Sequence, residues 1–424
     1  MGNRIRAKLS RVVAIIALGG LLESRAVADP VYSVTNLGNG GWSLLNNSGQ
    51  VAGGGYTTNH SPWSYTQIYN ANTGGQVTVV GVTAPTSTSP GSYDFPSRPL
   101  AMNDSGQVLV QGTLNITAYN LYQNGVMTSL SDSAPPVGIN NSGQTTGYDG
   151  INSLPYLYTQ QAYVQSGGTT TQLGVLPGAE ESTPVAINNL GEVAGTSYHS
   201  FASNPNGPGV IEVPGSEGWA HAFLYNGSKL VDLGTLGGKE SYAAALNNHG
   251  DVVGMSGTLA GLDAGDRNQI LHAFLAPAGG KMVDLGTLAG TNSSGATSIN
   301  DKGQVVGWSG LSSTISINEA TTLTTHAFLY QNGLMTDLNV LIPQTGVTLT
   351  KALSINDEGQ ILVDGVDGKG NAEQLLLTPL GDPVPSGPVY GLAPVPEPSM
   401  FLIMFCGAVA FAAKCGRKLG RQDR

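Results

Sequence analysis

One pattern of apolar and polar positions recurs seven times along the chain. Each copy has an apolar residue, an Asn, a second Asn or Asp and, two positions later, a Gly. The copies occupy residues 45–51, 102–108, 139–145, 187–193, 246–252, 299–305 and 355–361. Their first Asn residues follow one another at intervals of 57, 37, 48, 59, 53 and 56 residues. A period near fifty residues predicts a repeat architecture, with β-propellers among the main candidates.

Each copy has the composition of a hairpin corner. The apolar residue ends one strand, and the Asn pair is expected to tolerate a left-handed turn. The Gly takes a positive φ, where a side chain would clash. An apolar, β-rich run such as residues 304–308 then leaves the corner, which completes a hairpin. The seven glycines are Gly49, Gly106, Gly143, Gly191, Gly250, Gly303 and Gly359.

A second block follows the later corners. Residues 221–225, 272–275 and 326–330 begin with His-Ala-Phe-Leu and are apolar at nearly every position. Such strands are typical of sheets covered on both faces. A turn and a fourth strand follow, which gives each repeat the strand content of one propeller blade. We therefore expect an all-β, seven-bladed propeller over about residues 31–380, with an open β-solenoid as the alternative.

The two ends of this region are predicted to pair. The last copy supplies three strands before Pro and Gly dominate, and residues 32–38 resemble the missing fourth strand. Pairing them would complete the last blade and remove open sheet edges.

The first 28 residues have the zones of a secretory signal peptide. A basic start and an apolar run precede Ala26-Val27-Ala28, so signal peptidase is expected to cleave between Ala28 and Asp29. The repeat domain is assigned to residues 29–378, and a Pro- and Gly-rich linker to residues 379–394.

The C-terminus, residues 395–424, combines three ordered parts. Val395, Pro396, Glu397 and Pro398 precede an apolar run at residues 400–413 and a basic tail. At helical rise the run reaches about 21 Å, short of the roughly 30 Å bilayer core. The segment resembles the PEP-CTERM sorting domain. That resemblance implies a single membrane helix, transient anchoring in the inner membrane of a Gram-negative bacterium, and processing by an exosortase on the way to the cell envelope or extracellular surface.

The repeats also resemble HAF repeats, most clearly over residues 219–338. That likeness implies an extracellular repeat protein and defines no ligand or reaction.

The amino-acid composition limits which metals and macromolecules the repeat domain is expected to bind. Both cysteines, Cys406 and Cys415, lie near the C-terminus, so Cys-ligated zinc is not expected in the repeat domain. Residues 29–399 hold 8 of the 18 Lys and Arg and 26 of the 28 Asp and Glu, which is a formal charge of −18. Nucleic acid is excluded as a partner, because its binding depends on Lys and Arg at phosphates.

Three His–Asp pairs are the most regular candidates for chemistry. His221, His272 and His326 precede Asp232, Asp284 and Asp337 by 11, 12 and 11 residues. A metal or proton-transfer role is one interpretation. We favour a hydrogen bond between adjacent strands, because a catalytic arrangement would normally occur once per ring.

Other signals are sparse. Residues 364–371 are the best candidate for calcium, the only cofactor that the sequence leaves open. The body's two arginines, Arg98 and Arg267, are too few for a sialidase. No HExxH motif, P-loop or Gly-x-Ser-x-Gly elbow occurs. Of the tryptophans, Trp308 is expected in the core and Trp63 in an exposed loop, where stacking on a sugar is one interpretation of its role.

These observations predict a surface or matrix protein that binds extracellular polysaccharide and is not an enzyme. A secreted, polymer-degrading hydrolase with a carboxylate pair in a propeller channel is the alternative, and a purely structural spacer is the third interpretation.

Overall fold

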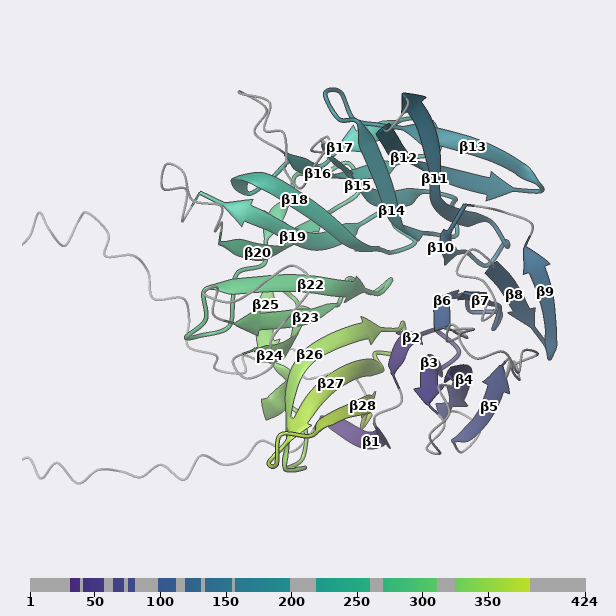
Figure 1. Ribbon diagram of the computed structural model, residues 1–424. Helices are drawn as coiled ribbons and strands as arrows, with labels where there is room; N and C mark the ends of the chain where they lie inside the picture. Colours follow the sequence, from purple (N-terminus) through teal and green to yellow (C-terminus); the bar gives the residue numbers. More distant parts are fainter. Residues whose placement is uncertain are drawn as a thin grey trace, which may run out of the picture.

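The computed structural model describes residues 31–38, 41–56, 64–71, 75–80, 98–111, 119–130, 134–154, 157–198, 219–259, 270–310 and 325–381. These residues form antiparallel sheets that follow one another around a central axis, which is the arrangement of a β-propeller (Figure 1). The all-β prediction is confirmed. The predicted signal peptide, the PEP-CTERM segment and Trp63 lie outside the described residues. Within the described ranges, no helix is long and apolar enough to span a membrane.

Five sheets have four strands each. The first three contain β2 (Trp42–Leu45), β3 (Gln50–Tyr56), β4 (Ser64–Asn70) and β5 (Gln76–Val80); β6 (Arg98–Met102), β7 (Val108–Gln111), β8 (Tyr119–Gln123) and β9 (Val126–Leu130); and β10 (Pro136–Ile139), β11 (Thr145–Leu154), β12 (Leu157–Ser166) and β13 (Thr169–Gly174). The other two contain β22 (Ser293–Ile299), β23 (Val305–Gly310), β24 (His326–Gln331) and β25 (Leu334–Asp337); and β26 (Val347–Ile355), β27 (Ile361–Asp367), β28 (Ala372–Pro379) and β1 (Tyr32–Gly38). A 3-10 helix, η3 (Leu338–Val340), follows β25.

The sixth sheet has eight strands and two antiparallel halves. Its strands are β14 (Glu181–Ile187), β15 (Val193–Tyr198), β16 (Ala220–Tyr225), β17 (Leu230–Asp232), β18 (Gly237–Leu246), β19 (Val252–Thr258), β20 (Leu271–Ala276) and β21 (Val283–Asp284). One parallel pair, Ala220 with Glu240, joins β16 to β18 and so connects the halves.

The N-terminal strand completes the last sheet. β1 pairs antiparallel with β28, with Tyr32 opposite Pro379 and Thr35 opposite Leu376. The backbone N–H of Val31 also donates to the Leu341 carbonyl, at 3.0 Å. The predicted pairing of residues 32–38 with the C-terminal strands is therefore confirmed. It closes the ring between the first and last strands that the structure describes.

The core lies between neighbouring sheets. Phe223, Phe274 and Phe328, the aromatic residues of the His-Ala-Phe-Leu strands, are completely buried. Phe274 packs with residues of β15, β16 and β18, so it fills the space between the two halves of the eight-stranded sheet. This burial explains why these strands are apolar at nearly every position. Trp308 is also buried, as predicted.

Candidate functional site: a polar ring on the propeller axis

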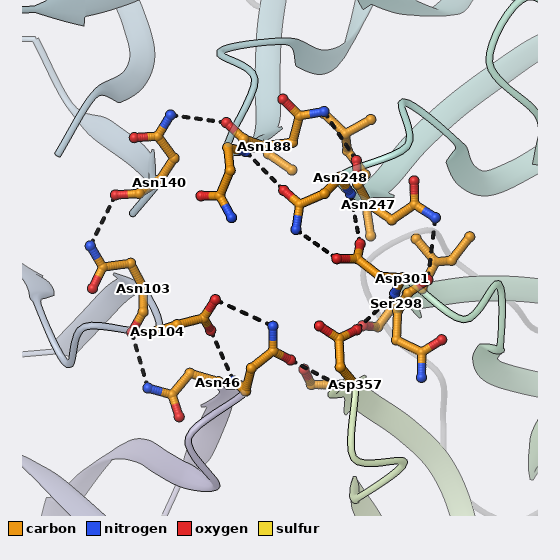
Figure 2. Close-up of a pocket in the computed structure, with 18 of the residues that line it drawn as sticks. Asn46, Asn103, Asp104, Asn140, Asn188, Asn247, Asn248, Ser298, Asp301 and Asp357 are labelled. Atoms are coloured by element: carbon orange, nitrogen blue, oxygen red, sulfur yellow. Dashed lines mark hydrogen bonds between the residues drawn. The ribbon is translucent and has the colours of Figure 1, made fainter. Parts of the chain in front are cut away.

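The first Asn of every corner bonds to the next corner. Its Nδ2 donates to the backbone carbonyl of the equivalent Asn in the following repeat, at 2.9 to 3.2 Å. The last bond runs from Asn356 back to Asn46, at 3.0 Å, and closes the circle. The members, all almost completely buried, are Asn46, Asn103, Asn140, Asn188, Asn247, Asn300 and Asn356. Figure 2 labels five of them around the axis: Asn46, Asn103, Asn140, Asn188 and Asn247.

The same Asn also holds its own corner together. Its Oδ1 accepts the backbone N–H four residues later, and its Nδ2 donates to the side chain of that residue. For Asn300 this partner is Gln304, with an Nδ2–Oε1 distance of 2.8 Å. The corresponding partners in the other corners are Gln50, Gln107, Gln144, Glu192, Asp251 and Gln360. The two N–H groups of one buried amide thus each find an acceptor, and its oxygen accepts a backbone N–H.

The second position of each corner forms another closed circle. The backbone N–H of this residue donates to the side-chain Oδ1 of the next corner's second residue, at 2.8 to 2.9 Å. The members are Asn47, Asp104, Asn141, Asn189, Asn248, Asp301 and Asp357. Asn and Asp both fit, because only an oxygen acceptor is required.

The corner glycines adopt positive φ, as predicted, from +71° at Gly49 to +82° at Gly250. The role predicted for the Asn pairs was wrong. Among the described residues other than glycine, only Asn124 and Asn332 have positive φ, and both lie outside the corners. The corner Asn residues are therefore present for their side-chain amides and carbonyls, and the glycine alone makes the left-handed step.

The two circles enclose a polar cavity of about 220 Å³. Three carboxylates, Asp104, Asp301 and Asp357, lie among its amides (Figure 2). Burial raises the pKa of Asp357, and the charges of Asp301 and Asp104 add to this increase. The hydrogen bond from the Asp301 N–H and the charge of Lys302 lower the pKa, but they do not offset the increase. The cavity is thus negatively charged and rich in acceptors. The bonds within it hold the ring closed.

The predicted His–Asp pairs are brought together. The Nδ1 of His221 lies 3.0 Å from Asp232, that of His272 lies 2.9 Å from Asp284, and that of His326 lies 2.6 Å from Asp337. Each bond joins the third and fourth strands of one repeat, the geometry of the strand-tie interpretation.

The Asp284 carboxylate shows how such a pair is balanced. Burial acts to raise its pKa, but the bond from His272, the N–H of Gly286 and the charge of His272 outweigh burial and leave the pKa below its ordinary value. Asp284 is therefore stabilised as a carboxylate in the folded chain.

The calcium candidate is a hairpin turn. The Oδ1 of Asp367 accepts the N–H groups of Lys369 and Asn371, and its Oδ2 accepts the Asn371 side chain. Asp364 bonds to Gln374 at 2.8 Å. Within the part of the chain that the structure describes, no three His, Cys, Asp or Glu side chains are grouped to hold a metal ion.

Sequence reasoning missed the second corner position and a set of buried serines. The Oγ atoms of Ser182, Ser241 and Ser294 accept an N–H from the preceding repeat and donate to a carbonyl there. For Ser241 the partners are Ala222 and Gly234. These serines lie six residues before the corner Asn in three successive repeats, and this fixed spacing is the signal that reveals them.

The chain matches no protein-family model and no curated protein. Several solved structures are similar to it. The β-propeller domain of the Trilobed protease from Pyrococcus furiosus has 7% identity and a TM-score of 0.49, over 83% of this chain and 98% of that chain. A streptogramin B lyase has 12% identity and a TM-score of 0.42, over 82% and 98%. A polysaccharide lyase, the PL25 ulvan lyase, has 9% identity and a TM-score of 0.38, over 81% and 94%. All three likenesses are too distant to indicate an activity, and the propeller fold is read from the sheets themselves.

Proposed function

We propose that the chain is a seven-bladed propeller, displayed on the envelope of a Gram-negative bacterium, that binds extracellular polysaccharide without catalysing a reaction. This number assigns one blade to each corner, and each half of the eight-stranded sheet is taken as one blade. Signal peptidase would cleave after Ala28, and an exosortase would process the segment at Pro396, Glu397 and Pro398.

The observation that carries this proposal is how the repeated polar residues are used. The corner Asn residues bond from repeat to repeat, and the His–Asp pairs bond within a repeat. Residues that recur in this way hold the ring, so the repetition favours a scaffold over a catalytic role. A rigid scaffold with an export signal and an envelope address is suited to presenting a surface to matrix polymers.

The full-length chain in mild detergent provides the test. It is applied to an array of bacterial and plant polysaccharides, and the incubated polymers are then analysed by size-exclusion chromatography. Binding with unchanged polymer size supports the proposal. Shortened polymer would favour a hydrolase with a carboxylate pair. Absence of binding to every polymer would refute polysaccharide recognition and favour a structural spacer.

The envelope address has a separate test. Replacing Pro396, Glu397 and Pro398 together by Ala should leave the protein in the inner-membrane fraction, whereas the wild-type protein should reach the outer surface. Unchanged fractionation of the variant would refute sorting through this motif.

A further inference from the structure

The eight-stranded sheet carries a row of residues aligned across four strands. Glu181 on β14 lies opposite Tyr198 on β15, Tyr198 lies opposite Ala220 on β16, and Ala220 lies opposite Glu240 on β18. Directly paired residues point to the same face of a sheet, and so do residues two apart on one strand. Tyr242, two positions after Glu240, therefore shares this face. The row includes the place where β16 of one half pairs in parallel with β18 of the other half.

Each carboxylate in the row holds a tyrosine hydroxyl. The Tyr242 hydroxyl donates to Glu240 Oε2 at 2.9 Å. The Tyr198 hydroxyl bonds to the Glu181 side chain, and burial together with the Glu181 charge raises the pKa of Tyr198 to about 12. Glu181 is 8% exposed, whereas Tyr198, Glu240 and Tyr242 are partly exposed. Tyr198, Glu240 and Tyr242 are thus partly open to a ligand, and the buried Glu181 bonds to Tyr198 and orients it.

The fold does not require these carboxylates. Glu181 and Glu240 each lie seven residues before their corner Asn, whereas Ser293 and Leu349 occupy the same position in the next two repeats. Ser293 and Leu349 are buried, so the position accepts uncharged residues. Burial of a carboxylate costs free energy unless bonds compensate for it. The occurrence of a carboxylate at this position in two adjacent repeats, buried at Glu181 and partly exposed at Glu240, indicates a role other than closure of the ring.

We infer that this row binds a polysaccharide that carries no carboxylate or sulfate groups. Tyr198 and Tyr242 supply ring faces on which a sugar can stack, and the Glu240 carboxylate accepts hydrogen bonds from sugar hydroxyl groups. This site rests on the proposed function and specifies it, because it names both the binding residues and the class of sugar.

The charge of the row selects that class. Glu181 and Glu240 are acidic, and none of the other aligned residues is basic. The surrounding body has a formal charge of −18. Lys239 is exposed beside Glu240 and Glu180 is exposed beside Glu181, so these neighbours and the two carboxylates of the row leave a net negative charge. A uronic acid or sulfated sugar placed here would face that charge, which disfavours binding. A neutral sugar meets no such penalty.

Titration calorimetry on the full-length chain in detergent tests the site, with cellohexaose as the neutral probe and an oligomannuronate of equal length as the anionic probe. Cellohexaose should bind, and the oligomannuronate should bind at least tenfold more weakly. Tyr242→Ala should weaken cellohexaose binding at least tenfold, and Tyr242→Phe should stay within threefold of wild type, because it keeps the ring. Glu240→Gln should weaken binding severalfold.

Two variants serve as matched controls. Tyr122→Ala removes a partly buried tyrosine of β8, and Glu358→Gln removes the same charge as Glu240→Gln at an exposed corner position. Both should bind like wild type. If Tyr242→Ala unfolds at a lower denaturant concentration than Tyr122→Ala, Glu240→Gln and Tyr198→Leu decide the result.

The outcomes separate the site from the function. Polysaccharide binding on the array that none of the row variants weakens would overturn the site and leave the proposed function standing. Equal affinity for the two probes would overturn the class of sugar. Failure of every polysaccharide on the array would overturn the function and the site together.

Discussion

Removal of one amide from the axial ring should destabilise the whole propeller. The Asn300 side chain makes four hydrogen bonds: its Nδ2 donates to the Asn356 carbonyl at 2.9 Å and to Gln304 at 2.8 Å, and its Oδ1 accepts the N–H groups of Lys302 and Gln304. Each bond contributes about 1 kcal/mol net, and a buried partner left without one costs about 1 to 3 kcal/mol. Since Asn300 is 3% exposed, Asn300→Ala should lower the free energy of unfolding by about 3 to 5 kcal/mol.

Urea unfolding followed by tryptophan fluorescence measures this change, because the buried Trp308 lies in the sheet that adjoins the corner. Asn371→Ala is the matched control: it removes an exposed Asn whose side chain bonds to Asp367 in a hairpin turn. Its effect should stay below about 1 kcal/mol. If the two variants were equally stable, the amide ring would not be what holds the repeats together.

Three further perturbations test the fold. Gly254→Ala should lower the free energy of unfolding by about 1 to 3 kcal/mol or more, because the added Cβ would overlap the Tyr242 carbonyl. Gly150→Ala has open space around the Cβ and should be nearly neutral, and the urea midpoints of the two variants compare them. Tyr32→Ala should lower the free energy of unfolding by about 3 to 5 kcal/mol, since Tyr32 is 3% exposed in the core beside the last sheet. Thr35→Ala, on the exposed side of β1, should lower it little, and equal urea midpoints for the two variants would contradict closure by β1. The lowered pKa of Asp284 predicts a stabilisation that is present above its unfolded pKa near 3.8 and is lost as the pH falls through the folded value; Asp284→Asn should remove that part of the acid dependence in urea titrations from pH 7 to pH 2.

The corners were predictable because they depend on local chemistry, and the ring closure was predictable because the last repeat lacks one strand. A glycine at positive φ leaves a fixed sequence mark, and each corner glycine was found where the pattern placed it. The pairing of β1 with β28 followed from the absence of a fourth strand after the last corner. In both cases the backbone restricts which residues the sequence can contain.

The use of the corner Asn residues was not predictable in the same way. Asn favours turns, so the turn itself seemed a sufficient reason for Asn46 or Asn300. Their actual partners lie in the next repeat: Asn46 bonds to the carbonyl of Asn103, 57 residues away. Such contacts depend on where the repeats lie in space. The row from Glu181 to Glu240 was hidden for the same reason, because its members pair across strands of two repeats.

The amide ring also explains how repeats of unequal length share one circle. Successive corner Asn residues are separated by 37 to 59 residues, yet every bond between neighbouring corners has nearly the same length. Since each bond joins only an amide and a carbonyl at the corners, the number of residues between corners does not enter its geometry. The backbone carbonyl of each corner Asn accepts the side-chain amide of the preceding corner Asn. The side-chain amide of the same residue then donates to the carbonyl of the following corner Asn. The ring can therefore keep seven repeats in register while the segments between corners differ, and such freedom allows one pair of adjacent repeats to carry Glu181 and Glu240 without opening the circle.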